Sequence, residues 1–153
     1  MTIMSDPAPV PRPCRVLLIE DDPDDVYLFQ RALDQANAGA ERGAVLEHVS
    51  DGLEAAYQVS IDDLKSRLPD VLVLDLNMPR LNGVKFLQAL RATFQLSDLP
   101  VVVLTTSTAK PVHDEALSAG AEMVFVKPDS ADALSEIAAE IVERGVAFAE
   151  SRL

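Results

Sequence analysis

The sequence has few cations, one cysteine and no long apolar run. Its 13 lysines and arginines face 25 acids, for a formal net charge of -12. This balance argues against a nucleic-acid-binding surface, because phosphate recognition needs a basic patch. No apolar run is long enough to span a bilayer, and the N-terminus lacks the apolar core of an export signal. With Cys14 unable to form an internal disulfide, we expect a cytoplasmic protein without nucleic-acid or membrane partners.

The length and composition suit one globular domain. The chain has 153 residues, of which 48% are apolar, enough for one sizeable core. Four prolines alternate in the first 14 residues, which predicts a flexible or polyproline-like tail over residues 1–14. The folded domain is therefore expected over residues 15–153.

Strand and helix patterns alternate along this domain. Strands are predicted near 15–19, 44–49, 71–75, 100–105 and 122–126. Helices are predicted from 23 to near 37–39, near 51–67, 83–94 and 110–119, and from 130 almost to the C-terminus, and a break in the second helix around Ser60 is left open. Such alternation predicts an α/β fold in which a parallel sheet carries helices on both faces.

Charged side chains stand where three of these strands end. Asp75 closes the apolar run 71–75, Glu20 and Asp21 follow the first strand, and Lys127 follows the last one. Open parallel sheets place their reactive groups at the carboxyl ends of the strands. Three carboxylates and a lysine that converge there can hold a divalent cation and accept a phosphoryl group.

These motifs resemble those of the response-regulator receiver domains of two-component signalling. The resemblance covers about residues 14–150 and rests on Glu20-Asp21, LDLNMP around Asp75, Thr105 at the end of VVVLT, and Lys127-Pro128. It implies the flavodoxin-like strand order 2-1-3-4-5 of the chemotaxis receivers. LDLNMPRLNG and VVVLTTST are most similar to the small single-domain response regulators that serve bacterial phytochromes.

The resemblance also implies roles for the residues of the site. Asp21 and Asp75 would bind Mg²⁺ directly, Glu20 would act through a water molecule, and the backbone carbonyl of Asn77 would complete the protein ligands. Asp75 would be the nucleophile that takes the phosphoryl group from a phosphohistidine. Lys127 would pair with Asp75 before the reaction and bind a phosphoryl oxygen after it.

Three further positions concern the switch. Thr105 would turn its hydroxyl toward the phosphoryl group, and Thr106 follows it, where the family often has a smaller residue. Pro128 is a candidate for a cis peptide bond, since the family bond before this proline is often cis. The familiar switch aromatic lies three residues before the lysine, where this chain has Val124, and alternation should point Phe125 to the opposite face of the sheet.

Other charged residues near these motifs are interpreted as structural. Asp22 is expected to cap the first helix, and Asp24 and Asp25 to stabilise its first turn. His48 and His113 lack metal-ligand spacing, so packed or solvated roles are expected for both.

The expected function is therefore that of a phosphoacceptor and not of a turnover enzyme. A sensor histidine kinase, more finely a bacteriophytochrome, would phosphorylate Asp75. Output would pass to another protein by contact or to a histidine phosphotransfer protein. A homodimer is expected, and Val146 and Phe148 would either join its contact or pack on the domain itself.

Two alternatives remain open from the sequence. One is an interaction module with the same fold that is never phosphorylated, although it would not need all five motif residues. The other is a phosphohydrolase of the haloacid dehalogenase type. Those enzymes use a second aspartate two residues after the nucleophile, where this chain has Asn77.

Overall fold

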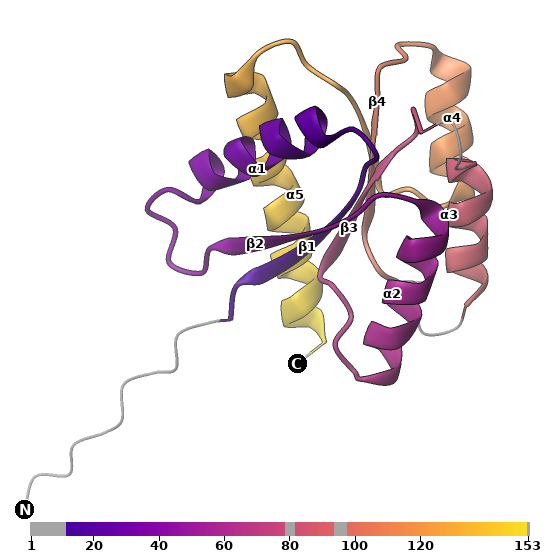
Figure 1. Cartoon of the computed structure of the whole chain (residues 1–153), viewed down its shortest axis with the longest axis horizontal. Helices are drawn as coiled ribbons and strands as arrows, with labels where there is room; N and C mark the ends of the chain where they lie inside the picture. The colour runs from indigo at the N-terminus through magenta and orange to yellow at the C-terminus, as the bar shows by residue number, and fades with distance from the viewer. Residues whose placement is uncertain (1–11, 79–81, 94–97, 153) are drawn as a thin grey trace, which may run out of the picture.

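A single parallel sheet organises the molecule. The computed structural model describes residues 12–78, 82–93 and 98–152. Its strands lie in the order β2-β1-β3-β4-β5 and are all parallel (Figure 1). The elements are β1 (Cys14–Ile19), α1 (Pro23–Asn37), β2 (Ala44–Val49), α2 (Gly52–Leu64), β3 (Val71–Asp75), α3 (Gly83–Ala92), β4 (Val101–Thr105), α4 (Lys110–Ala119), β5 (Met123–Val126) and α5 (Ala131–Ser151). The predicted flavodoxin-like α/β fold with order 2-1-3-4-5 is confirmed.

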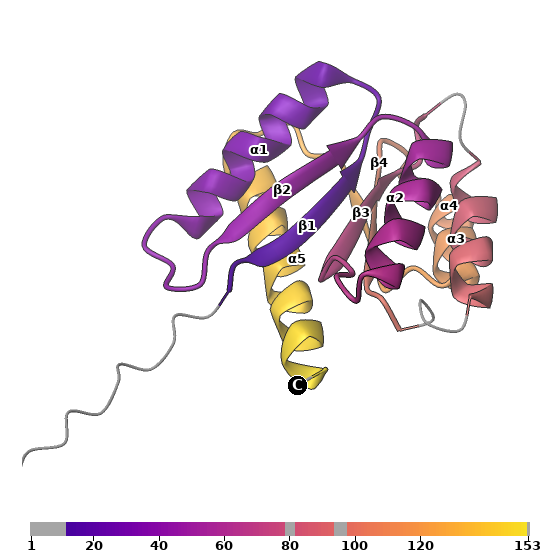
Figure 2. The same cartoon turned by 60° about the horizontal axis from the view of Figure 1, so that its bottom comes forward.

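The helices cover both faces of this sheet. Helices α1 and α5 lie on one face, and α2, α3 and α4 lie on the other (Figure 1, Figure 2). Side chains of β1 alternate between the two layers. Leu17 and Ile19 join the core under α2, α3 and α4, whereas Val16 and Leu18 join the core under α1 and α5.

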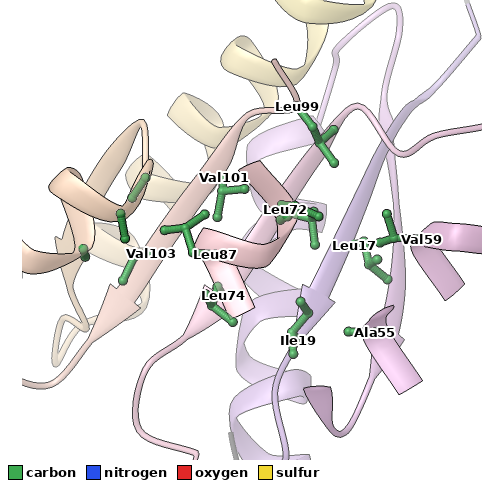
Figure 3. Packing of buried hydrophobic residues seen from close by; sticks show 14 of the residues in the cluster. Leu17, Ile19, Ala55, Val59, Leu72, Leu74, Leu87, Leu99, Val101 and Val103 are labelled. Carbon is green, nitrogen blue, oxygen red and sulfur yellow. The ribbon is translucent and has the colours of Figure 1, made fainter. Parts of the chain in front are cut away.

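Two of the three inner strands are enclosed completely. Every residue of β3 and β4 is buried, as expected for parallel strands that are covered on both faces. Figure 3 shows Leu74 of β3 and Val103 of β4 packed near Leu87 of α3. This packing holds the carboxyl ends of β3 and β4 in fixed positions beside each other.

The helix boundaries follow local capping chemistry. The carboxylate of Asp22 accepts a hydrogen bond from the backbone N–H of Asp24 at 2.9 Å, so Asp22 caps α1 as predicted. Gly120 ends α4 in the left-handed conformation, with φ of 117°. No break interrupts α2 at Ser60, and α2 ends at Leu64, three residues before the predicted boundary. The predicted end of α3 at residue 94 lies outside the described residues, and the described helix stops at Ala92.

A buried carboxylate joins both ends of the domain at the sheet edge opposite the predicted site. Asp70 has no exposed surface and binds Arg12 through two hydrogen bonds of 2.8 and 2.9 Å. Arg152, which follows α5, lies 2.7 Å from the same carboxylate, and the backbone N–H of Arg15 donates to it at 2.8 Å. Arg12 and Cys14, which the predicted tail includes, are thus tied to the domain by this carboxylate and by β1. Residues 1–11 lie outside the described part, so the boundary of the tail stays a prediction.

The last turns of α5 pack on the domain itself. Val146 contacts the core under α1 and α5, and Phe148 contacts the core under α2, α3 and α4. The guanidinium of Arg152 stacks over the Phe148 ring at 4.3 Å from its centroid. Of the two roles left open for Val146 and Phe148, this is the intramolecular one. Among the described residues, no helix is long and apolar enough to cross a membrane.

Removing the Asp70 carboxylate should destabilise the fold. Asp70→Ala leaves the partly buried N–H of Arg15 without its acceptor and frees both arginines, so we expect the free energy of unfolding to fall by about 2 kcal/mol. Asp114→Ala breaks only the exposed pair with Lys110 and should cost about 0.5 kcal/mol or less. Urea unfolding of both variants measures the difference. Equal losses would show that the Asp70 cluster adds no more than a surface pair.

Candidate functional site

Three carboxylates meet where β1 and β3 end. These strands are neighbours, and Ile19 of β1 pairs with Leu74 of β3, so the residues after each strand share one crevice. One oxygen each of Glu20, Asp21 and Asp75 lies within 4.8 Å of the others. Glu20 and Asp75 are 3% and 2% exposed, whereas Asp21 is exposed. The structure thus brings the predicted acids together in a cluster that opens to solvent on the Asp21 side.

Lys127 reaches this cluster from β5. Its backbone N–H donates to the carbonyl of Thr105 at 2.8 Å, which anchors the residue beside the end of β4. Its Nζ lies 3.1 Å from Asp75 Oδ2, as predicted, and 3.3 Å from Glu20 Oε2. The ammonium therefore faces the two buried carboxylates together.

A third acid at Lys127 was missed by the sequence interpretation. Asp25 Oδ2 lies 3.1 Å from Lys127 Nζ, although Asp25 was assigned only to the first turn of α1. The sequence offers two adjacent acids in that turn, Asp24 and Asp25, and no local pattern says which of them faces the strand ends. Only the way α1 packs on the sheet distinguishes them.

Each buried carboxylate has one oxygen held by backbone and one facing the lysine. Asp75 Oδ1 accepts from the backbone N–H of Asn77 at 2.9 Å, so Oδ2 is the oxygen next to Lys127. Glu20 Oε1 accepts from the backbone N–H of Asp22 at 3.1 Å, which leaves Oε2 toward the lysine. Both side chains are thereby oriented before any cation or phosphoryl donor arrives.

The predicted switch residues lie on the other side of Asp75. Thr105 is 1% exposed at the end of β4, and its hydroxyl donates to Asn77 Oδ1 at 3.5 Å. The amide of Asn77 donates to the Thr106 hydroxyl at 2.8 Å. Asn77 thus connects the segment after Asp75 with both threonines. The roles predicted for the Asn77 carbonyl and for the two hydroxyls toward metal and phosphoryl stay predictions.

The side chains of β5 alternate as expected. Val124 packs on the core under α2, α3 and α4, and Phe125 packs on the core under α1 and α5. The prediction that Phe125 points away from the face of Val124 is confirmed. At the position of the familiar switch aromatic, the side chain is thus the smaller and branched one of Val124.

The cis candidate at Pro128 is corrected. The described residues contain no cis peptide bond, so the Lys127-Pro128 bond is trans. The trans isomer is the lower-energy form of a bond to proline in general. With it, the Lys127 side chain reaches the carboxylates of Glu20, Asp25 and Asp75.

Both histidines bind backbone carbonyls beside the site. His48 Nε2 lies 2.8 Å from the carbonyl oxygen of Glu20, and His113 Nε2 lies 2.7 Å from that of Ser107. A carbonyl can only accept, so Nε2 carries a proton in each ring. Neither histidine belongs to the carboxylate cluster, in line with the structural roles predicted for them.

The cluster is electrostatically poised for a cation. Burial raises the pKa of Glu20 to about 8, and the hydrogen bond with Asp75 and its charge add to the rise. Burial by itself lowers the pKa of Lys127, but the charges of Asp75 and Glu20 outweigh it and raise that pKa above its ordinary value. One lysine is too little charge for these acids, so Glu20 keeps a proton near neutral pH. Three oxygen ligands with an open, exposed side fit a hard divalent cation.

Cation binding should depend on the proton of Glu20. Because that proton must leave before three carboxylates can share a cation, we expect Mg²⁺ affinity to rise with pH between about pH 6 and pH 9. In Glu20→Gln the rise should be much smaller, and in Asp24→Asn, which changes an exposed acid outside the cluster, it should match the wild type. Calorimetric titration over this range measures the slopes. Equal slopes in Glu20→Gln and the wild type would contradict the assignment.

The same group should affect the metal-free fold in the opposite direction. The raised pKa means that the folded state binds more protons than the unfolded state between about pH 4.5 and pH 8. The contribution of Glu20 to stability is therefore present at the acid end of this window and lost as the pH rises through it. Thermal unfolding without metal should show this loss in the wild type and less of it in Glu20→Gln.

Comparison with known proteins gives a consistent result. The family model of the response regulator receiver domain matches residues 16–139. A curated relative, a protein-glutamate methylesterase/protein-glutamine glutaminase of Anaeromyxobacter dehalogenans, is 34% identical over 140 residues, which are 90% of this chain and 36% of the relative. The chain thus spans about a third of the length of that relative.

Two solved structures resemble the whole fold. A response regulator in red light signalling of R. palustris is 30% identical, with a TM-score of 0.73, and the match covers 82% of this chain and 89% of the other. The phosphorylated cyanobacterial phytochrome response regulator RcpA is 27% identical, also with a TM-score of 0.73, over 88% of this chain and 94% of the other. With the family model matching most of its length, the chain belongs to the response regulator receiver domain family, and a receiver domain is itself a phosphoacceptor and not a catalytic enzyme.

Proposed function

We propose that this receiver accepts a phosphoryl group from a sensor histidine kinase onto Asp75 in a Mg²⁺-dependent reaction, and that this changes a protein-interaction surface. The observation that carries the proposal is the environment of Asp75 Oδ2. This oxygen lies 3.1 Å from Lys127 Nζ and belongs to a buried carboxylate that is part of the carboxylate cluster. A nucleophile, a cationic partner and a cation site therefore occupy one crevice.

In this reaction the protein forms one covalent bond, and it otherwise positions the reactants and stabilises charge. Asp75 Oδ2 attacks the phosphorus, an O–P bond forms, the P–N bond to the donor histidine breaks, and its electron pair stays on the imidazole nitrogen. Glu20, Asp21 and Asp75 would hold Mg²⁺, which would neutralise charge on the phosphoryl oxygens. Lys127 moves from Asp75 Oδ2 to a phosphoryl oxygen. Thr105 and Thr106, next to Asn77, offer hydroxyl donors to the remaining oxygen.

The two alternatives fare differently. A phosphohydrolase of the haloacid dehalogenase type has no support, because the chain belongs to the receiver family and Asn77 cannot act as a general acid. An unphosphorylated interaction module shares the fold, and the direct test below separates it from a phosphoacceptor.

The direct test is phosphorylation by acetyl phosphate. We expect the intact mass to increase by one phosphoryl group with Mg²⁺ and not without it, and Asp75→Asn to show no increase. Asp70→Asn serves as a control, because it alters a buried aspartate at the opposite edge of the sheet. No increase in a wild-type protein that is folded and binds Mg²⁺, with acetyl phosphate and with a phosphorylated histidine kinase, would favour the interaction module.

We further propose that the donor kinase is a bacterial phytochrome and that the protein works as a single-domain regulator. The likeness to the two light-signalling regulators supports this, since the match covers most of each of those chains. A histidine phosphotransfer protein or another target would then bind the surface of the receiver domain itself. In cells we place the reaction in the cytoplasm, where the kinase domain of a sensor would meet it.

Donor preference and assembly are both measurable. At equal autophosphorylation, a bacteriophytochrome kinase should transfer its phosphoryl group faster than a chemotaxis kinase.

Light scattering over a concentration series should show a homodimer that contacts through α4, α5 or the segment after them. Equal transfer from both kinases would remove the phytochrome link, and a monomer at every concentration would remove the dimer.

A further inference from the structure

Lys127 has one acidic partner outside the carboxylate cluster of Glu20, Asp21 and Asp75. Its ammonium carries three N–H donors, and three carboxylate oxygens surround it, from Glu20, Asp75 and Asp25 at 3.3, 3.1 and 3.1 Å. Glu20 and Asp75 belong to the carboxylate cluster, and Asp25 does not. Asp25 also differs in origin, because it comes from the first turn of α1 and not from the end of a strand.

Asp25 is not needed to begin the helix. The N-cap bond of α1 comes from Asp22, whose carboxylate accepts from the N–H of Asp24. Asp24 is exposed, and its side chain has no ion pair among the described residues. Both acids in the first turn interact favourably with the helix dipole. What separates them is that the carboxylate of Asp25 reaches back to the lysine.

The surroundings favour a strong contact. Asp25 and Lys127 border a small cavity of about 70 Å³ between α1 and the start of α5, and apolar side chains form most of its wall. Its apolar wall residues are Leu18, Leu28, Phe29, Leu104, Pro128 and Leu134, and Glu20 lines it beside Asp25 and Lys127. The lysine side chain is 19% exposed and that of Asp25 is 39% exposed. An apolar wall on one side reduces solvent screening, so this pair is stronger than one on the open surface.

From this arrangement we propose that Asp25 is a positioning residue for phosphoryl transfer, acting through Lys127; the inference rests on the function proposed above. In the free protein, the ammonium sits between two carboxylates that the cation also needs. Asp25 gives it a partner that no cation competes for. When a cation binds the cluster and a phosphoryl group is transferred to Asp75 Oδ2, Lys127 keeps its ion pair with Asp25. It exchanges only its contacts with Glu20 and Asp75.

Loss of Asp25 should therefore affect transfer more than folding. Without it, Lys127 is shared by Glu20 and Asp75 alone, where it blocks the attacking oxygen, and it is less well held when the phosphoryl oxygen arrives. A misplaced contact of this kind slows a positioned reaction. Cation binding needs none of the atoms of Asp25, so the cation affinity should change only through the lost unit of charge.

Three variants test the proposal by the initial rate of phosphorylation from acetyl phosphate at saturating Mg²⁺. Asp25→Asn should slow the reaction on the order of tenfold, the effect typical of residues that orient a site from behind it. Asp24→Asn removes the same charge from the same turn and should stay within about twofold of the wild type. Asp25→Glu keeps a carboxylate within reach of Lys127 and should restore most of the rate. Circular dichroism checks that each variant is folded.

A second measurement separates positioning from other roles. The Mg²⁺ dissociation constants of Asp25→Asn and Asp24→Asn should agree within about twofold, because each loses one charge near the cluster. A much weaker constant in Asp25→Asn alone would make Asp25 part of the cation site and overturn the proposal. Equal phosphorylation rates in Asp25→Asn and Asp24→Asn, with the wild type reacting normally, would overturn it while leaving the phosphoacceptor function intact. A wild type that never reacts would remove the function and this inference with it.

Discussion

The structure depends on how negative charge is balanced where β1 and β3 end. A parallel sheet with order 2-1-3-4-5 places Glu20, Asp21 and Asp75 in one crevice. Buried carboxylates that face each other are costly. Lys127 offsets part of this repulsion, because its ammonium contacts Glu20, Asp75 and Asp25 together. The proton kept by Glu20 offsets another part, and a bound divalent cation would neutralise the acids in place of that proton.

How far the buried carboxylates are neutralised differs between the two ends of the strands. The edge formed by the carboxyl ends contains the reactive site, and the opposite edge contains Asp70. At the carboxyl edge, the acids are held less completely, with an exposed side at Asp21 and with Oδ2 of Asp75 held only by the side chain of Lys127. At the opposite edge, Asp70 is satisfied by Arg12, Arg152 and the N–H of Arg15. A satisfied buried carboxylate stabilises one conformation, whereas an incompletely neutralised one is able to react. The enclosed strands β3 and β4 lie between these edges and hold the reactive one in place.

Much of this arrangement could be predicted from the sequence because its signals are local. Short apolar runs that end in a charged residue identified the strands and their reactive ends, and the strand order followed from the family resemblance. Contacts between distant segments were not predictable in this way. Asp25 and Asp24 are equivalent in a helix pattern, and only the packing of α1 turns one of them to Lys127. Arg12 was assigned to a proline-rich tail, because its partner Asp70 lies 58 positions away.

The chain also contains a route from the site to α4 that needs no aromatic residue at position 124. The Thr105 hydroxyl accepts from the backbone N–H of Ser107 at 3.1 Å, and the carbonyl of Ser107 accepts from His113 Nε2 in α4 at 2.7 Å. If the hydroxyl turned to a phosphoryl oxygen on Asp75, the Ser107 N–H would lose its acceptor. The partly buried N–H would then need another acceptor, either water or one supplied by a rearranged segment after β4. Through its bond to Ser107, His113 would connect such a rearrangement to the first turns of α4. Two hydrogen bonds of Ser107 thus connect the reactive crevice to a helix surface, where Val124 alone has no polar group to do so.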